Sequence, residues 1–317
     1  MNTKGVIFKN AFTLGFGKAV SDIFILLFLV YFSQHFGQEV LGQYAFAMAT
    51  GGIVSILVSL GLNTYIIREI SKNNHRTVEF VGQLFLLRLI CASICMGLLV
   101  FLTEIFGCDP ELRNIIVTIG AFHFLQKING IFNSGFIAQE SMNIPALLGI
   151  LERIIIFFIG GLGIYFSWPP FAVLSIYPLS SCLIFCFSYF IFYHSYGKPE
   201  FSIDLTFIKK SIVQASPFFF IFFLGQFYDR FGLIILTILH GASVSGIYLA
   251  GERLVSTING FSILFATSFF PSISRISGGD KKNLENLSLW ALRVVYVSLF
   301  PLAGFIYLFS DEIILQI

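Results

Sequence analysis

Long apolar runs constrain this chain more than any other feature of its sequence. Nine runs of about 20 residues occur, each long enough as an α-helix to cross a hydrocarbon core about 30 Å thick. They cover residues 11–32, 41–67, 80–102, 114–136, 145–166, 171–193, 213–239, 246–270 and 288–309. Charged residues make up only 11% of the chain, against roughly 25% in soluble domains. We therefore predict an all-α, polytopic (multi-pass) membrane protein with nine transmembrane helices.

The Lys and Arg residues between the runs predict the orientation. One side carries Lys4, Lys9, Arg68, Lys72, Arg76, Lys198, Lys209, Lys210, Arg275, Lys281 and Lys282, whereas Arg113 is the loop cation of the other side. Because cytoplasmic loops are enriched in Lys and Arg, we expect a cytoplasmic N-terminus. The first run lacks a small-residue cleavage site and should be retained as a helix.

A short pattern occurs twice, each time between two apolar runs. Residues 37–44 (GQEVLGQY) and 241–248 (GASVSGIY) share the pattern G-x-x-V-x-G-x-Y. Six predicted helices separate one copy from the next, an even number, so both copies are expected at the external face. Tyrosine is enriched at membrane interfaces, so Tyr44 and Tyr248 are expected to anchor there.

This repeat predicts the division of the chain. Residues 1–205 are expected to form a six-helix N-terminal bundle, and residues 206–317 the first half of a second, parallel-repeated bundle. A parallel repeat of this kind places a transporter's binding site between its two halves.

The sequence lacks the motifs of several enzyme and cofactor classes. No CxxC, HExxH, P-loop or GxSxG pattern is present, and the loops between the runs are short. The net charge of +2 does not indicate a nucleic-acid partner. We therefore expect no catalytic residue, no metal site and no cofactor.

Several charged residues lie inside the apolar runs. The cations are Lys18, Arg88, Lys127, Arg153, Arg230, Arg253 and Arg293, and the acids are Asp22, Glu152, Asp229 and Glu252. A cation at mid-helix costs about 2.5–3.5 kcal/mol on insertion scales, so such residues normally face a bundle interior or an aqueous cavity. Arg293 is close enough to a helix end to reach the interface, and we set it aside.

Helical spacing places these charges on faces. In the run 114–136, His123, Gln126, Lys127, Gly130, Asn133 and Ser134 form one polar stripe, and Glu252, Ser256 and Asn259 form another in the run 246–270. Lys18 and Asp22 are one turn apart and can pair. A purely structural interpretation stays open for each pair, with Asp22 held by Lys18 and Asp229 by Arg230, and with Glu152, Arg153, Glu252 and Arg253 paired to neighbouring helices.

The cations outnumber the acids, and mutual pairing cannot absorb the excess. Buried Lys and Arg would bind an anion such as a pyrophosphate through charge-assisted hydrogen bonds. The predicted head-group ligands are Lys18, Arg88, Lys127, Arg153, Arg230 and Arg253. A buried carboxylate can exchange a proton or coordinate Na⁺ as a cavity opens, so Asp22, Asp229 and Glu252 are candidates for coupling to H⁺ or Na⁺.

An ordered set of motifs resembles the polysaccharide (O-antigen-type) flippase family of the multidrug/oligosaccharidyl-lipid/polysaccharide exporter superfamily. The motifs are GQFYDRFG at 225–232, the second copy of the repeated pattern, AGER at 250–253 and FPSIS at 270–274. In the first half, LGQY at 41–44, GLN at 61–63 and Arg68-Glu69 are similar to the opening helices of that family. Arg253 and Asp229 match the family pattern best.

This resemblance implies a fold and a function. Two six-helix bundles would form a V-shaped cavity that opens alternately to the two sides of a bacterial cytoplasmic (inner) membrane. The cargo would be a polyprenyl-pyrophosphate-linked oligosaccharide, such as a repeat unit of O-antigen, lipopolysaccharide or another surface polysaccharide. Membrane lipids and a glycan polymerase of the same pathway are further expected partners. Because the family carries about twelve helices, we expect this chain to be a fragment or the product of an interrupted reading frame.

Two other classes of function remain as alternatives. One is a cation-coupled small-molecule or drug exporter of the same superfamily, although a cavity for cations should be richer in acids than in bases. The other is a membrane enzyme, such as a glycan polymerase or acyltransferase, although such an enzyme needs a catalytic base or a sizeable external loop.

Overall fold

The computed structural model describes residues 3–72, 76–202 and 204–252, together with positions 289, 293, 296, 297, 300, 301, 304 and 308. Side chains of residues 3–12 and 14 are outside this description. The described part is all helical, which confirms the predicted fold class. It contains the first seven predicted helices and the start of the eighth, whereas most of the ninth and Arg253 lie outside the described residues.

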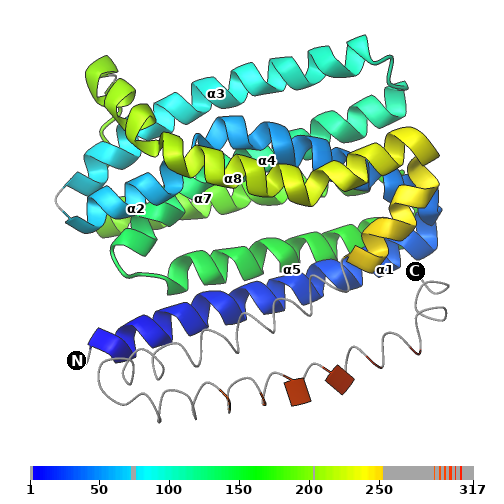
Figure 1. The fold of residues 1–317 in the computed structure, drawn as a ribbon, viewed down its shortest axis with the longest axis horizontal. Coiled ribbons are helices and arrows are strands. Elements are labelled where there is room, and N and C mark those ends of the chain that lie inside the picture. Colours follow the sequence, from blue (N-terminus) through cyan, green and yellow to red (C-terminus); the bar gives the residue numbers. More distant parts are fainter. Residues whose placement is uncertain are drawn as a thin grey trace.

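Eight helices make up this part of the chain (Figure 1). They are α1 (Thr3–Ser59), α2 (Leu62–Lys72), α3 (Thr77–Ile105), α4 (Pro110–Ala138), α5 (Asn143–Tyr165), α6 (Pro170–Leu174), α7 (Ile176–Tyr196) and α8 (Leu205–His240). Six stretches are long and apolar enough to cross a membrane, and the first of them, Gly15–Lys72, contains two predicted runs. The α6–α7 pair corresponds to one predicted run.

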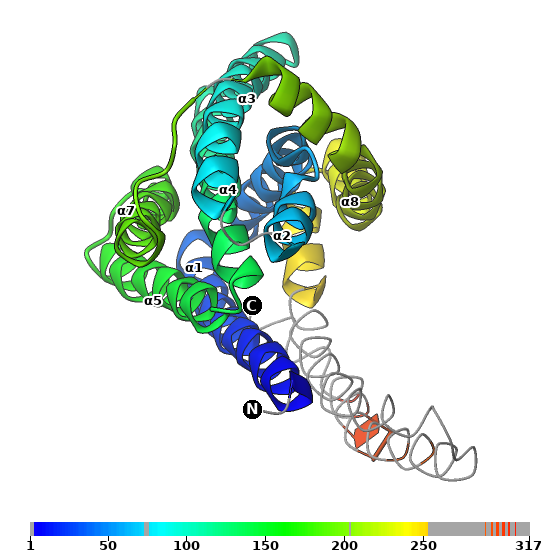
Figure 2. The same ribbon diagram turned by 90° about the vertical axis from the view of Figure 1, so that its left-hand side faces the viewer.

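The helices lie side by side, with α1 at the centre of the packing. Helix α1 contacts α4, α5 and α8, and α4 also contacts α3 and α7. Figure 2, which views the bundle from one end, shows α8 separated from α5 and α7. Helices α1–α7 are called the first half below. Its core is aromatic, with Phe28, Phe32, Phe122 and Tyr177 at most 1% exposed.

The first glycine of each repeated pattern reverses the chain. Gly37 has φ 81° and ψ 174°, and Gly241 has φ 86° and ψ 174°. These values lie in the left-handed region of φ that favours glycine. The rest of each pattern is helical, so the predicted link between two helices is in fact a single residue at Gly37.

The second glycine of each pattern lets the two copies touch. A Cβ atom on Gly42 would overlap the carbonyl oxygen of Ala242, and a Cβ on Gly246 would overlap that of Gln38. Ala242 follows Gly241 as Gln38 follows Gly37, so the two contacts are equivalent within the repeat. The two copies therefore pack against each other in a two-fold arrangement, backbone against backbone.

The predicted interfacial position of Tyr44 is wrong. Its side chain is fully buried, and its hydroxyl lies 3.0 Å from that of Tyr177 on α7. Two buried hydroxyls that bond to each other satisfy their polar atoms inside the bundle, so Tyr44 joins α1 to α7. Tyr248, the equivalent residue of the second copy, is 48% exposed.

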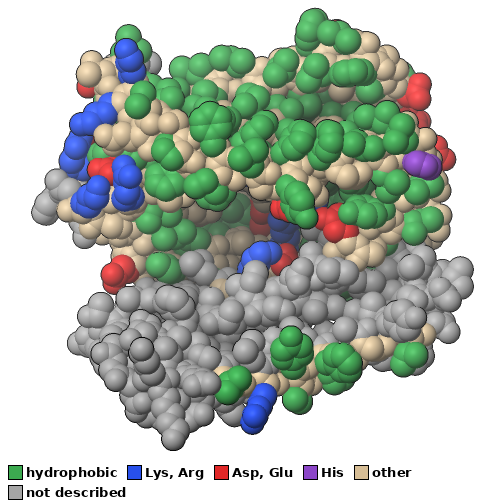
Figure 3. Space-filling model, in the orientation of Figure 1, with side chains coloured by type: hydrophobic (Ala, Val, Ile, Leu, Met, Phe, Trp, Pro, Cys, Tyr) green, Lys and Arg blue, Asp and Glu red, His purple; other side chains and the backbone are tan. Residues whose placement is uncertain are grey.

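Charges collect at opposite ends of the helices. Figure 3 shows Lys and Arg side chains at the left end, where α2 ends and α8 begins, and Asp and Glu side chains at the right end. The long face between them is largely hydrophobic (Figure 3). This distribution is typical of a protein that spans a membrane.

Candidate functional site

A cavity of about 450 Å³ lies between the first half of the chain and α8. It is lined by Ile56, Ser59, Gly61, Asn63, Lys127, Ile221, Phe222, Gly225, Gln226 and Asp229. These residues come from the end of α1, the start of α2, the middle of α4 and the middle of α8. In Figure 3, charged side chains gather at a hollow in the otherwise hydrophobic face.

Two of the predicted charges stand on the cavity wall. Lys127 reaches it from α4 and Asp229 from α8. No ion pair joins Asp229 to Arg230 within the described residues, because Arg230 Nη1 instead lies 3.6 Å from Glu252 Oε1. Asp229 is exposed where it lines the cavity.

Three predicted cations gather around one histidine. Lys127 on α4, Arg153 on α5 and Arg230 on α8 are all close enough to His123 to act on it electrostatically. The His123 ring packs against α1, where a Cβ on Gly51 would lie 3.0 Å from its Cδ2 atom. Its Nε2 atom is buried and finds no hydrogen-bond partner among the described residues. Of these three cations, Lys127 lines the cavity, whereas Arg230 is paired with Glu252.

Other predicted residues satisfy one another. Lys18 Nζ lies 2.7 Å from Asp22 Oδ2 on α1, which confirms that this pair forms. Arg153 stacks over the ring of Phe122 at 5.6 Å, and it forms no ion pair with Glu152. These contacts match the structural interpretation of such charges.

Glu152 is buried, and no cation among the described residues pairs with it. It accepts a hydrogen bond of 2.9 Å from Gln126 Nε2 on α4, and a second, short one from Ser181 Oγ on α7. This polar contact lies between α4, α5 and α7, so Glu152 belongs to the interior of the first half and not to the cavity wall.

Arg88 lies behind the cavity wall and does not line it. Its side chain on α3 is fully buried, and its guanidinium donates to the carbonyl of Lys127 and to the side chain of Asn63. The predicted role as a direct ligand needs an exposed guanidinium, which this conformation does not offer. Arg253, the remaining predicted ligand, lies outside the described residues.

The break between α1 and α2 contributes wall residues that sequence reasoning missed. The predicted run 41–67 is interrupted at Leu60 and Gly61, whose φ angles are 47° and 70°. This interruption brings Ser59 and Asn63 to the cavity. In the sequence, Gly61 indicates this break, because a helix commonly ends at a glycine with positive φ.

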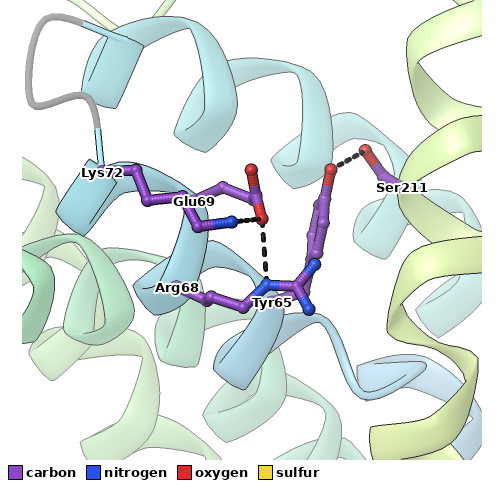
Figure 4. Close-up of polar contacts among 5 residues, drawn as sticks. All are labelled: Tyr65, Arg68, Glu69, Lys72 and Ser211. Carbon is purple, nitrogen blue, oxygen red and sulfur yellow. Dashed lines mark hydrogen bonds and ion pairs between the residues drawn. The ribbon is translucent and has the colours of Figure 1, made fainter.

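A second contact between the first half and α8 lies near the positively charged end (Figure 4). Ser211 Oγ on α8 donates to Tyr65 Oη on α2 at 3.5 Å. The guanidinium of Arg68 lies over the rings of both Tyr65 and Phe218, at 5.6 and 5.7 Å, and its Nε donates to Glu69. Lys72 Nζ bonds the same carboxylate at 2.9 Å.

Comparison with solved structures identifies the fold. The chain superimposes on a multidrug resistance MATE family transporter of the MOP superfamily in its inward-facing conformation, with a TM-score of 0.70, 17% identity, and coverage of 92% of this chain and 71% of that one. The outward-facing conformation of such a transporter gives 0.64, with 19% identity and coverage of 98% and 73%. A MOP superfamily transporter from Pyrococcus furiosus, for which a reversed polarity of the binding pocket is described, also gives 0.64, with 16% identity and coverage of 98% and 73%. At such identities the likeness concerns the fold alone.

Comparison at the level of sequence identifies the family. No curated protein matches the chain. The model of the family described as "Polysaccharide biosynthesis protein" matches residues 7–277, which is most of the sequence. The chain therefore belongs to the polysaccharide biosynthesis protein family and has the fold of a multi-pass membrane exporter of the MOP superfamily.

Proposed function

We propose that this protein moves a polyprenyl-pyrophosphate-linked oligosaccharide across a bacterial cytoplasmic membrane by alternating access. One observation carries the proposal: Lys127 lines the cavity, and Arg153 and Arg230 act with it on His123, against the acid Asp229 on the wall and Glu252 beside Arg230. A pyrophosphate would satisfy such donors through charge-assisted hydrogen bonds. The family match to polysaccharide biosynthesis supports the glycan part of the cargo.

The remaining parts of the proposal rest on the charges of the site, on the Lys and Arg of the loops and on the family resemblance. Asp229 is the candidate for ion coupling, because it lines the cavity and is found in no ion pair with another described residue. Asp22 and Glu252 already have cationic partners and would have to exchange them for a coupling ion. The protein acts as a transporter and not as an enzyme, its N-terminus lies in the cytoplasm, and a glycan polymerase receives the cargo.

The test replaces Lys127 in the chromosomal copy of the gene. Lys127→Ala should abolish surface polysaccharide and leave lipid-linked oligosaccharide on the cytoplasmic leaflet, because the head group loses its charged contact on the wall. Lys127→Arg keeps the charge and should retain much of the export. The readouts are surface glycan by gel and the leaflet position of the lipid-linked intermediate.

A lysine far from the cavity provides the matched control. Lys210 is exposed near the start of α8, and Lys210→Ala removes the same charge without touching the wall. Protein abundance in the membrane should be equal in all variants. Normal surface glycan in Lys127→Ala cells that hold wild-type amounts of the protein would refute the proposed function.

A small-molecule exporter is the second candidate. It is favoured by the open carboxylate of Asp229, which could bind a cationic compound, and by the fold shared with MATE transporters. In that case Asp229→Asn should abolish resistance to cationic drugs while surface glycan stays normal. The flippase proposal expects the reverse for Lys127→Ala, so the two variants separate the two functions.

A further inference from the structure

Arg88 is an arginine that is buried without an anion. Its side chain has 0% exposure, and no carboxylate lies within ion-pair distance among the described residues. Its Nε atom has no hydrogen-bond partner there. A buried charge without a counter-ion destabilises the fold, so we expect the remaining donors of Arg88 to form hydrogen bonds that offset this cost.

Those donors hold together two walls of the cavity. Nη1 donates to the carbonyl of Lys127 on α4, and Nη2 donates to the carbonyl of Ser59 at 3.4 Å and to Asn63 Oδ1 at 2.6 Å. Ser59 is the last residue of α1, where a helix leaves carbonyl groups without partners. The three residues that Arg88 binds are all residues of the cavity wall.

The contact with Arg88 determines which way Asn63 points. A guanidinium has donors and no acceptor, so it must meet the Oδ1 atom of the amide and not the Nδ2 group. The Nδ2 group, with its two hydrogens, then lies next to Gly130 of α4, where an added Cβ would be 3.2 Å away, at a point where Asn63 lines the cavity. In the part of the chain that the structure describes, no hydrogen bond from Asn63 Nδ2 is found.

We propose that Asn63 donates a hydrogen bond from Nδ2 to a phosphate oxygen of the cargo, and that Arg88 is the positioning residue that fixes it in this orientation. Lys127 stands on the same cavity wall and supplies the charge, while Asn63 supplies a directed neutral donor. The buried charge of Arg88 lies directly behind both residues. This inference rests on the proposed function, because it takes the phosphate of that cargo as the ligand.

The substitution Asn63→Asp separates this role from a structural one. An aspartate would give Arg88 its missing anion, so the variant should be more stable than the wild type. It would also replace a donor that faces the cavity with a negative acceptor, which repels phosphate. Stability and binding should therefore change in opposite directions. Because the new charge alone repels phosphate, the neutral variant Asn63→Leu decides whether the donor itself is used.

The experiment measures binding of inorganic pyrophosphate to the purified chain in detergent by calorimetry, together with the melting temperature. Asn63→Asp should raise the melting temperature and weaken binding by at least about tenfold, the usual effect of losing one hydrogen bond to a charged group. Asn63→Leu, which removes the donor without adding charge, should weaken binding by about the same factor. Arg88→Lys keeps the charge but loses the planar guanidinium, which donates to several partners at once. This variant should weaken binding with a smaller loss of stability than Arg88→Met.

The outcomes distinguish this proposal from the function on which it rests. If the wild type binds pyrophosphate and Lys127→Ala weakens that binding, but Asn63→Asp and Asn63→Leu bind as the wild type does, the role of Asn63 is refuted and the proposed function stands. If the wild type does not bind pyrophosphate, both are overturned. The two Asn63 variants keep the test decisive even where Arg88→Met fails to fold.

Discussion

We expect the second glycine of each repeated pattern to keep the two copies in contact at the end of the bundle that is predicted to be external. In the described conformation, a Cβ atom on Gly42 would overlap the carbonyl oxygen of Ala242. Both partners are backbone, so neither can move aside as a flexible side chain would. Gly42→Ala should therefore destabilise the contact between the two copies by about 1–3 kcal/mol, the usual cost of overpacking.

This cost acts on the conformational equilibrium and not on the helix. Residue 42 is helical, and the gain in helix propensity from alanine is about 1 kcal/mol in either conformation, so it cancels between them. The clash exists only while the two copies touch. The ratio of externally closed to open molecules should fall by about 5- to 150-fold.

The assay is labelling of a cysteine in the cavity from outside the cell. Gln226→Cys places a thiol on the cavity wall, in a background where the five native cysteines are serine. An impermeant maleimide should label this thiol slowly with Gly42 present and faster in the Gly42→Ala protein. Gly246→Ala should have the same effect, because its Cβ would overlap the carbonyl of Gln38.

A glycine with free space is the control. A Cβ on Gly149 of α5 would meet nothing within 4 Å, so Gly149→Ala makes the same chemical change without a clash. Its labelling rate should equal that of the parent protein. Equal rates for Gly42→Ala and Gly149→Ala would refute the idea that the repeated pattern closes the external end.

Three further predictions concern packing, orientation and pH dependence. Tyr44→Phe removes the buried hydrogen bond to Tyr177 and should lower the free energy of unfolding by about 1 kcal/mol. Its Tm should therefore fall, whereas the Tm of the control Tyr248→Phe, at an exposed position, should not. Equal Tm values for the two variants would contradict this account. Cys108, between α3 and α4, should be labelled from outside intact cells, and labelling confined to inverted vesicles would reverse the predicted orientation. Burial raises the pKa of the Cys108 thiol, and only the thiolate reacts, so its labelling should accelerate about tenfold per pH unit until the pH exceeds that pKa.

Local features of the sequence predicted the helices and the repeat. A transmembrane helix depends on the length and polarity of its own run, so the runs could be located before any packing was known, and the seven that lie within the described residues are helical. The glycines of the pattern were found because they recur at a fixed spacing. Their separate uses, positive φ at Gly37 and close approach at Gly42, became visible only in three dimensions.

Features that depend on which helices are neighbours could not be predicted in this way. Tyr44 looked like an interfacial residue, because nothing in its own helix indicates that Tyr177 lies opposite. Arg88 looked like a ligand, because the sequence does not show that its side chain is buried against Asn63 and Lys127, which are far from it in the chain. A charge in an apolar run indicates a polar neighbour and does not say whether that neighbour is a ligand or the protein itself.

Helix α8 is held to the first half near both ends of the cavity and hardly in between. Beyond its C-terminal end, Gly246 meets Gln38, and toward its N-terminal end the backbone near Phe219 lies so close to Gly61 that a Cβ there would overlap it. Among the described residues, α8 itself buries little more than Ser211, Ala215 and Leu233. Because so little apolar surface joins α8 to the first half, separating them costs much less than separating α1 from α4 or α5. Under the proposed alternating access, the contact at one end of α8 would open while the contact at the other end holds, and α8 would move its part of the cavity wall.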